Sequence, residues 1–414
     1  MATSTNEWRR WPIVAGAALG LGSGGSVFVF ISSLFVLPLS QEFGWTRGQI
    51  AAAATTGLLT AVLAPFIGRL ADRHGARPVI LGSIAMMSLG YLTLATMRGS
   101  LTMYYVGMFL MGLGGVGTTG MTYTRIITGW YSRHRGLALG ISLAGVSVFA
   151  FILPPLLSRL IDALSWRAGY VALAAIGIGV GVPAVIWLLR EPPPATPFGS
   201  SALTAGAAGI SQGWHTYLRC TARKPVFWLL FISMILVNVA GSPLLAQLTP
   251  LLSDRGIPIR TAAGLLSAYA AAVLIGRLIG GYLIDRVSPP LVAAVAMLAP
   301  AVGCLMLIDT DSVMTTVVLA VLLLGLSQGA EMDLLAFFIA RHLGLRDYST
   351  TFAVMIAGVV IGNVLGALLF GFTHDLTGTY GIALAAAAVC FLGGAASLYA
   401  LRWQPLIERD PITA

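Results

Sequence analysis

Four ionisable residues interrupt long apolar stretches of the sequence: Arg125, Arg277, Glu331 and Asp333. Charged side chains are expensive in hydrocarbon, so they usually face a water-filled cavity or a partner there. An arginine stays protonated and presents a planar fork that can hold a carboxylate through two hydrogen bonds. A carboxyl group nearby can carry a proton, because its proton affinity depends on desolvation and on neighbouring charge. These residue types indicate recognition of an organic anion together with protons.

The spacing of three of these residues places them in one layer. Arg277 lies eight residues before Asp285, which ends its apolar stretch. Glu331 and Asp333 lie ten and eight residues before Arg341. At ~1.5 Å per residue, helices would hold all three groups about 12–15 Å inside their ends.

The composition requires elements that cross a membrane. Hydrophobic residues make up 57% of the 414 residues and charged residues only 9%, against roughly 25% charged in soluble proteins. The net charge of +9 comes from basic residues at the ends of apolar stretches, which membrane topology explains, so we expect no nucleic-acid partner. The three cysteines are widely separated and match neither a disulfide framework nor a metal site. We therefore predict an all-α, polytopic membrane protein without metal or cofactor.

Twelve apolar stretches of about the length needed to cross a bilayer are predicted to be helical spans. They lie near residues 12–38, 49–70, 78–97, 102–128, 136–160, 167–190, 225–249, 261–285, 289–308, 313–340, 350–373 and 380–402. The only long polar break, rich in Pro, Ser, Thr and Gly, divides them six and six. We predict an N-terminal six-helix bundle (1–190), a cytoplasmic linker (191–224) and a C-terminal six-helix bundle (225–414).

Basic residues set the predicted orientation. Sixteen of the 24 Lys and Arg fall on the side of Arg9, six fall on the opposite side, and two lie within spans. By the positive-inside rule, both termini are expected in the cytoplasm. The N-terminal stretch shows no cleavage site after a short apolar region, so we interpret it as a retained first span.

The stretch Gly68–Leu81, with the sequence GRLADRHGARPVIL, joins the second and third predicted spans. Gly68, Gly75 and Pro78 would allow a tight reversal, and its arginines mark the turn as cytoplasmic. The C-terminal half repeats this spacing at Gly281–Arg286. Two similar bundles with repeated turns are typical of a transporter with a binding site at the membrane midplane.

The chain resembles the major facilitator superfamily over essentially its whole length, and the Gly68–Leu81 stretch matches that family's signature at nearly every position. The resemblance implies that this turn takes part in the switch between inward and outward access, with Asp72 facing Arg133 or Arg135. The alternative is that the charges only fix topology. The predicted gating set is Gly68, Asp72, Arg73, Gly75, Arg77, Arg125, Arg133, Asp285, Arg286 and Asp333.

Within the superfamily, three stretches resemble the monocarboxylate and oxalate/formate branch: Phe43–Arg47, Trp130–Ala138 and Pro154–Pro155. That branch places a substrate-binding arginine in span eight, which makes Arg277 the expected anion site. The alternative is that Arg277 pairs permanently with Glu331 or Asp333, leaving a neutral cavity. Polar residues within other spans complete the predicted substrate site: Tyr123, Asn238, Tyr269 and Asn363.

The internal repeat also predicts a gate. Two Arg-His-x-Gly-Leu stretches, at Arg133 and Arg341, are offset by 208 residues, which sets Arg125 opposite Asp333. A cation in one bundle facing an anion in the other could close the cytoplasmic mouth. The alternative is that Asp333 pairs within its own bundle, for example with Arg277.

We therefore predict a secondary active transporter of a bacterial cytoplasmic membrane, not an enzyme, that moves a small monocarboxylate by alternating access. Glu331 or Asp333 would carry the symported proton. The expected partners are the substrate, protons and lipid, and the protein is expected to be a monomer. Three alternatives remain: a carrier of a neutral or aromatic metabolite such as a vitamin, an efflux pump for toxic compounds, and a non-transporting sensor.

Overall fold

The computed structural model describes residues 10–131, 135–191, 221–284, 286–308, 313–343 and 348–404, and in these ranges it contains helices and no strand. The helices before residue 192 are α1 (Trp11–Gly22), η2 (Gly25–Val27), α2 (Phe28–Ile31), α3 (Ser33–Phe43), α4 (Arg47–Ala51), η3 (Ala52–Thr55), α5 (Thr56–His74), α6 (Ala76–Thr96), α7 (Leu101–Gly117), α8 (Gly120–Trp130), α9 (Arg135–Ala163), α10 (Trp166–Ile176), η4 (Gly177–Gly181) and η5 (Ala184–Leu188). Those after residue 220 are α13 (Pro225–Ala246), α14 (Leu248–Asp254), α15 (Ile259–Ile284), α16 (Pro289–Met306), α17 (Met314–Phe338), η6 (Ile339–Leu343), α18 (Tyr348–Thr377), α19 (Gly381–Tyr399) and η7 (Ala400–Trp403).

Helical segments fall on all twelve predicted stretches. Within the described residues, ten of the stretches form helices that are long and apolar enough to cross a membrane. An eleventh span is formed if α1 is counted together with η2 and α2, which are bent by 47° relative to it. The remaining stretch is the continuous helical run from α4 through α5, which is less apolar because its last turns carry Arg69, Asp72 and Arg73. The predicted all-α membrane fold is confirmed.

Several predicted spans are broken where the sequence weakens the helix. The first stretch bends after Gly22, and the fourth divides at Thr118 and Thr119. The two breaks meet, because the Gly25 backbone N–H donates to Thr118 Oγ1 at 3.0 Å. The threonine side chain thus satisfies a backbone donor that the bend leaves free, as membrane-spanning backbone requires.

The turn between α5 and α6 is shorter than predicted. Helix α5 continues to His74 and α6 begins at Ala76, so Gly75 alone reverses the chain, with φ at +90°. Only glycine adopts such a conformation without strain. The prediction that Gly68 also belongs to the reversal is wrong, because the α5 backbone remains helical through it.

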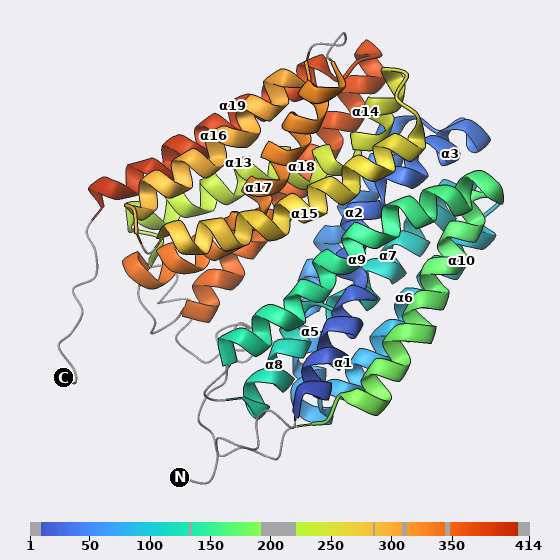
Figure 1. Cartoon of the computed structure of the whole chain (residues 1–414), viewed down its shortest axis with the longest axis horizontal. Helices are drawn as coiled ribbons and strands as arrows, with labels where there is room; N and C mark the ends of the chain where they lie inside the picture. Colours follow the sequence, from blue (N-terminus) through green and yellow to red (C-terminus); the bar gives the residue numbers. More distant parts are fainter. Residues whose placement is uncertain are drawn as a thin grey trace.

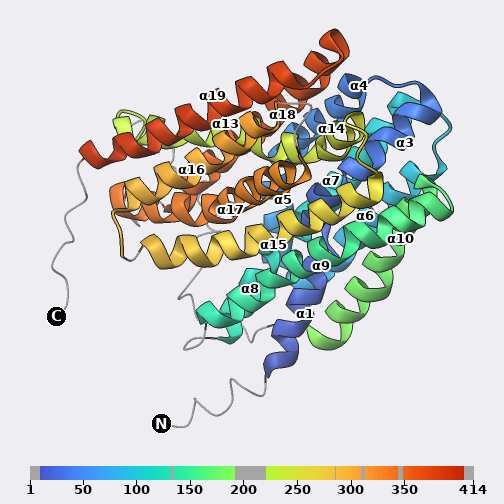
Figure 2. The same ribbon diagram turned by 45° about the horizontal axis from the view of Figure 1, so that its top comes forward.

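The helices pack in two groups, one on each side of residues 192–220, and the predicted linker lies mostly outside the described residues. Before this stretch, α1 packs on α9, and α6 packs on α7 and α10; after it, α15 packs on α17, α13 packs on α18, and α16 packs on α17 and α19. Figures 1 and 2 show the two groups converging near α3 and α14 and diverging toward the ends where α1 begins and α19 finishes. We call these the closed end and the open end.

Helices of the two groups contact each other mainly toward the closed end. Helix α9 packs on α15, α4 packs on α18, and α3 packs on α14. Helices α4 and α18 approach each other closely at Gly48 and Gly371, where an added Cβ on Gly371 would lie 2.8 Å from the Gly48 Cα. Small residues allow backbones to approach in this way where packing, not water, drives helix association.

Close backbone approach also joins α15 to α17, and it yields a stability prediction. A Cβ at Gly276 would collide with the carbonyl oxygen of Leu326, whereas a Cβ at Gly281 on the same helix meets nothing within 4 Å. We expect Gly276→Ala to destabilise the protein by about 1–3 kcal/mol through overpacking. Gly281→Ala should be neutral or stabilising, because alanine is the better helix former. Melting temperatures of the two purified variants in detergent check this, and equal values would contradict it.

Candidate functional site

A buried carboxyl group lies in the middle of the C-terminal group of helices. Glu331 of α17 is 1% exposed. Its Oε1 accepts a hydrogen bond from Asn238 Nδ2 of α13 at 2.5 Å, and its Oε2 accepts one from Gln328 Nε2 at 2.7 Å. Both donors are neutral amides, and no ion pair to Glu331 is recorded among the described residues. Glu331 is thus anchored by hydrogen bonds without a counter-ion.

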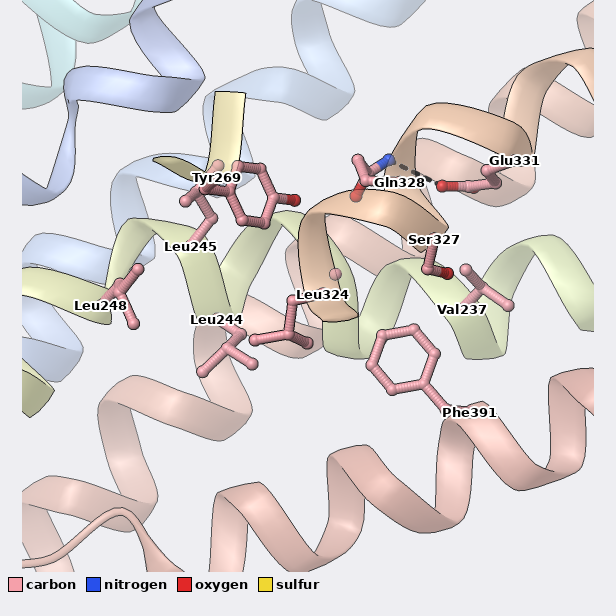
Figure 3. A pocket seen from close by; sticks show the side chains of 11 residues that line it. Val237, Leu244, Leu245, Leu248, Tyr269, Leu324, Ser327, Gln328, Glu331 and Phe391 are labelled. Atoms are coloured by element: carbon pink, nitrogen blue, oxygen red, sulfur yellow. Dashed lines mark hydrogen bonds between the residues drawn. The ribbon is translucent and has the colours of Figure 1, made fainter. Parts of the chain in front are cut away.

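Glu331 lines a small pocket between α13, α15, α17 and α19, shown in Figure 3. The Tyr269 hydroxyl points toward Gln328 in this view, and Leu244, Leu324 and Phe391 supply apolar walls. The pocket volume is about 10 Å³, roughly what a single water occupies. It can therefore admit water or a proton to the carboxyl group but not an organic molecule.

The two amides suit a group that changes its protonation state. An ionised carboxylate accepts hydrogen bonds only, whereas a protonated one also donates. Asn238 and Gln328 can present either NH₂ or oxygen to Glu331 by rotating the amide, so hydrogen bonds are available in both states. Sequence reasoning missed Gln328, although its position three residues before Glu331 places both on one face of α17.

Asp333 points away from Glu331, because two residues on a helix differ by ~200° around its axis. Its Oδ2 lies 3.6 Å from Arg277 Nε of α15, and the two side chains are 45% and 39% exposed. This distance is too long for a hydrogen bond. The structure records no hydrogen bond for any guanidinium nitrogen of Arg277 among the described residues, and the Nε is buried. Arg277 therefore keeps unused donors beside a loosely associated carboxylate.

A larger cavity of about 230 Å³ lies between the two groups of helices. One wall comes from α2, α3, α4, η3 and α7 together with Tyr170 of α10, and the other comes from α13, Gln247 and α18. The first wall contains aliphatic side chains and four aromatic ones, Phe28, Phe35, Tyr104 and Tyr170, so we call it the aromatic wall. The predicted substrate residue Asn363 lines the second wall, and its Oδ1 is buried without a hydrogen-bond partner among the described residues.

The other predicted substrate residues lie elsewhere. Asn238 and Tyr269 surround Glu331, and the Tyr269 ring lies 6.1 Å from the ring of Phe30 in the opposite group. Tyr123 is fully buried within the N-terminal group against Gly20. We therefore do not include Tyr123 in the site that we propose.

Residues 15–350 match the sequence profile of the Major Facilitator Superfamily. The chain belongs to this superfamily. It is 26% identical over 370 residues to monocarboxylate transporter 13 of Rattus norvegicus, covering 89% of this chain and 83% of that protein. It is also 26% identical over 402 residues to the probable sulfoacetate transporter SauU of Cupriavidus necator, covering 90% and 89% of the two chains.

Solved structures of superfamily members share the fold. A bacterial homologue of the human lysosomal transporter Spinster, crystallised inward-facing and unoccupied, superimposes with a TM-score of 0.68 at 18% identity. The alignment covers 97% of this chain and 94% of that one. A second structure of this homologue, inward-facing and occupied, gives a TM-score of 0.66. The transporter fold predicted from the sequence is therefore confirmed.

Part of the predicted gating set of this superfamily member lies outside the described residues. Arg133 and Asp285 fall there, as do the side chains of Asp72 and Arg125. The proposed contact between Arg125 and Asp333 therefore stays a prediction.

Apart from Asp333, which lies beside Arg277, the described members of the gating set lie near the open end. Arg77 fixes the turn, since its backbone N–H donates to Glu191 Oε1 at 2.7 Å and its Nη2 donates to the Ile186 carbonyl at 2.7 Å. Arg286 lies over the ring of Tyr282, and Arg73 is exposed.

Sequence reasoning missed a polar network at the closed end. Arg47 Nη1 and Nη2 donate to the two carboxylate oxygens of Asp254 at 2.5 and 2.6 Å, across the boundary between the groups. Arg47 Nη1 also donates to the Tyr380 hydroxyl at 2.7 Å, and that hydroxyl donates to Gln247 Oε1 at 3.0 Å. The Gly48 N–H donates to Asp375 Oδ2 at 2.8 Å. The sequence shows a charged residue, Arg47, directly after Phe43–Thr46, which could have marked it as functional. Nothing in the sequence identified Asp254 as its partner.

Proposed function

We propose that this superfamily member moves a small monocarboxylate together with a proton across a bacterial cytoplasmic membrane by alternating access. The observation that carries the proposal is the guanidinium of Arg277, which has unused donors and lies 3.6 Å from Asp333. A carboxylate ligand would supply the two-point hydrogen bonding that Asp333 does not. The names of the rat and other mammalian relatives support the same substrate class.

Glu331 is the proposed proton carrier. Its hydrogen-bond partners among the described residues are both neutral, and an isolated charge in the membrane interior is expensive. Binding and release of a proton at this residue would therefore couple to the arrangement of the surrounding helices. We assign Asp333 a second role, as the group that neutralises Arg277 when no substrate is bound.

The distribution of basic residues supports placing both termini and the open end in the cytoplasm. On this assignment the structure represents the inward-facing state. The closed-end contacts would then separate when the site opens to the other side of the membrane.

The test is ligand-dependent thermal stability of the purified protein in detergent. A ligand at a hundredfold above its dissociation constant stabilises the folded state by ~2.7 kcal/mol. We expect a monocarboxylate to raise the melting temperature of the wild type and of Arg402→Ala, a control at an exposed arginine in η7. The shift should vanish in Arg277→Ala and be reduced in Arg277→Lys, which lacks the planar fork.

Other outcomes distinguish the alternatives. Stabilisation by neutral compounds alone, unchanged in Arg277→Ala, would assign Arg277 to a permanent pair with Asp333 and favour a carrier of neutral metabolites. Stabilisation by lipophilic cations would favour an efflux pump. Either result contradicts the monocarboxylate proposal.

A further inference from the structure

The residues that line the cavity between the two groups of helices indicate which part of a substrate could bind there. Among the described residues that line it, none is charged, and all are apolar or aromatic except four polar ones, Ser32, Ser242, Gln247 and Asn363. Two of the four already use local partners. Ser32 Oγ donates to the Val29 carbonyl, and Gln247 Oε1 accepts from Tyr380. The cavity therefore offers an apolar surface with few free polar groups.

The aromatic wall is held rigidly. The rings of Phe35 and Tyr170 stack at 4.1 Å with an interplanar angle of 15°. Tyr104 is fixed by a hydrogen bond from its hydroxyl to the Ile50 carbonyl at 3.4 Å. A preformed apolar pocket binds an apolar group without the entropic cost of ordering its walls.

The size of the cavity is sufficient for a ring. Its volume of about 230 Å³ exceeds the roughly 150 Å³ of an apolar cavity known to accept benzene. A short acid such as acetate or pyruvate would leave most of this surface uncovered.

The distance to the proposed anion site prevents a short acid from contacting both Arg277 and the cavity. Tyr269 contacts Phe30, which neighbours the cavity residues Phe28 and Val29. Arg277 lies eight residues further along α15, or ~12 Å along the helix axis. A ligand that contacts both Arg277 and the cavity must therefore be elongated.

We propose that this cavity binds the apolar body of the substrate, and that the substrate is a monocarboxylate carrying an aromatic ring. The ring would pack against Phe35 and Tyr170, with Asn363 available for one polar substituent. The carboxylate part of this assignment rests on the proposed function of Arg277, whereas the ring site rests on the cavity alone.

The experiment compares ligands that differ by one ring. We expect 3-phenylpropionate to bind the purified full chain about ten- to hundredfold more tightly than propionate, because burial of a phenyl group supplies that difference. Binding is measured by the ligand-dependent melting temperature. Propionate binding as tightly as 3-phenylpropionate would overturn the inference.

Variants that fill the cavity provide the second arm. Ala367→Leu in α18 and Ala54→Leu in η3 add a side chain to opposite walls, so one remains informative if the other fails to fold. Each should weaken 3-phenylpropionate binding about tenfold and leave propionate binding unchanged. Ala357→Leu, on the exposed face of α18 that includes Ile361 and Leu365, is the matched control and should alter neither. The inference would also be overturned if both Ala367→Leu and Ala54→Leu still bound 3-phenylpropionate more tightly than propionate.

A third ligand separates this inference from the proposed function. If 3-phenylpropionamide binds as tightly as the acid and the filled variants weaken both, the ring site stands and the anion site at Arg277 fails. If propionate and 3-phenylpropionate bind equally and both require Arg277, the anion site stands and the ring site fails.

Discussion

Asp254→Asn is expected to open the closed end of the molecule. The Arg47 side chain, only 10% exposed, donates two hydrogen bonds to Asp254, and asparagine leaves the guanidinium without its counter-ion. Breaking one partner of a fully buried pair costs 3–5 kcal/mol. Since Asp254 is 37% exposed, we expect about 2–3 kcal/mol, which shifts the population roughly 30- to 140-fold toward a state in which this end is open.

The opening can be measured by cysteine labelling. Ser33 is fully buried and its hydroxyl lies 2.9 Å from that of Thr249 in the opposite group. In a background without the three native cysteines, a Ser33→Cys reporter should react with a membrane-impermeant maleimide much faster once Asp254→Asn is added.

A second ion pair at the same end is the matched control. Asp162 of α9 accepts a hydrogen bond from Arg260 of α15 at 2.9 Å, but the Arg260 side chain is 71% exposed. Exposed pairs contribute about 0–1 kcal/mol, so Asp162→Asn should change the labelling rate little. Equal effects of the two substitutions would show that the network at Arg47 is not what holds this end closed.

The sequence predicted the elements well, because long apolar stretches with polar turns leave few alternatives in a membrane. The errors lie in local backbone geometry. The division of the fourth stretch at Thr118 depends on a hydrogen bond from Gly25, which lies 93 residues away in sequence. The one-residue turn at Gly75 shows that a helix can continue through a glycine such as Gly68 when the next element fixes its end.

The sequence predicted which residues form the candidate site better than it predicted how they are arranged in space. Glu331 and Asp333 lie two residues apart on α17, so their opposite directions follow from helix geometry alone. Which of the two faces Asn238 of α13 and which faces Arg277 of α15 depends on the rotation of α17 about its axis. The sequence gives no measure of that rotation. The pairing of Arg47 with Asp254 joins residues 207 positions apart, and nothing in a single sequence relates them.

Glu331→Gln is expected to abolish proton-driven accumulation of the substrate while preserving substrate binding and exchange. A pH difference of one unit supplies about 1.4 kcal/mol per proton, which sustains a tenfold gradient. Glutamine fills the same volume and can still hydrogen-bond to Asn238 and Gln328, so the fold should persist. It cannot bind and release the proton, and accumulation in proteoliposomes should therefore fall to the equilibrium level.

Three measurements make the Glu331 prediction specific. Counterflow of labelled substrate without a pH gradient should continue in Glu331→Gln, because exchange needs no net proton movement. Asp333→Asn, at the other predicted proton carrier, should retain tenfold accumulation per pH unit but alter substrate affinity through Arg277, 3.6 Å away. If Asp333→Asn loses accumulation and Glu331→Gln keeps it, the proton moves at Asp333. Glu331, which is hydrogen-bonded to Asn238, would then serve only to link α17 to α13.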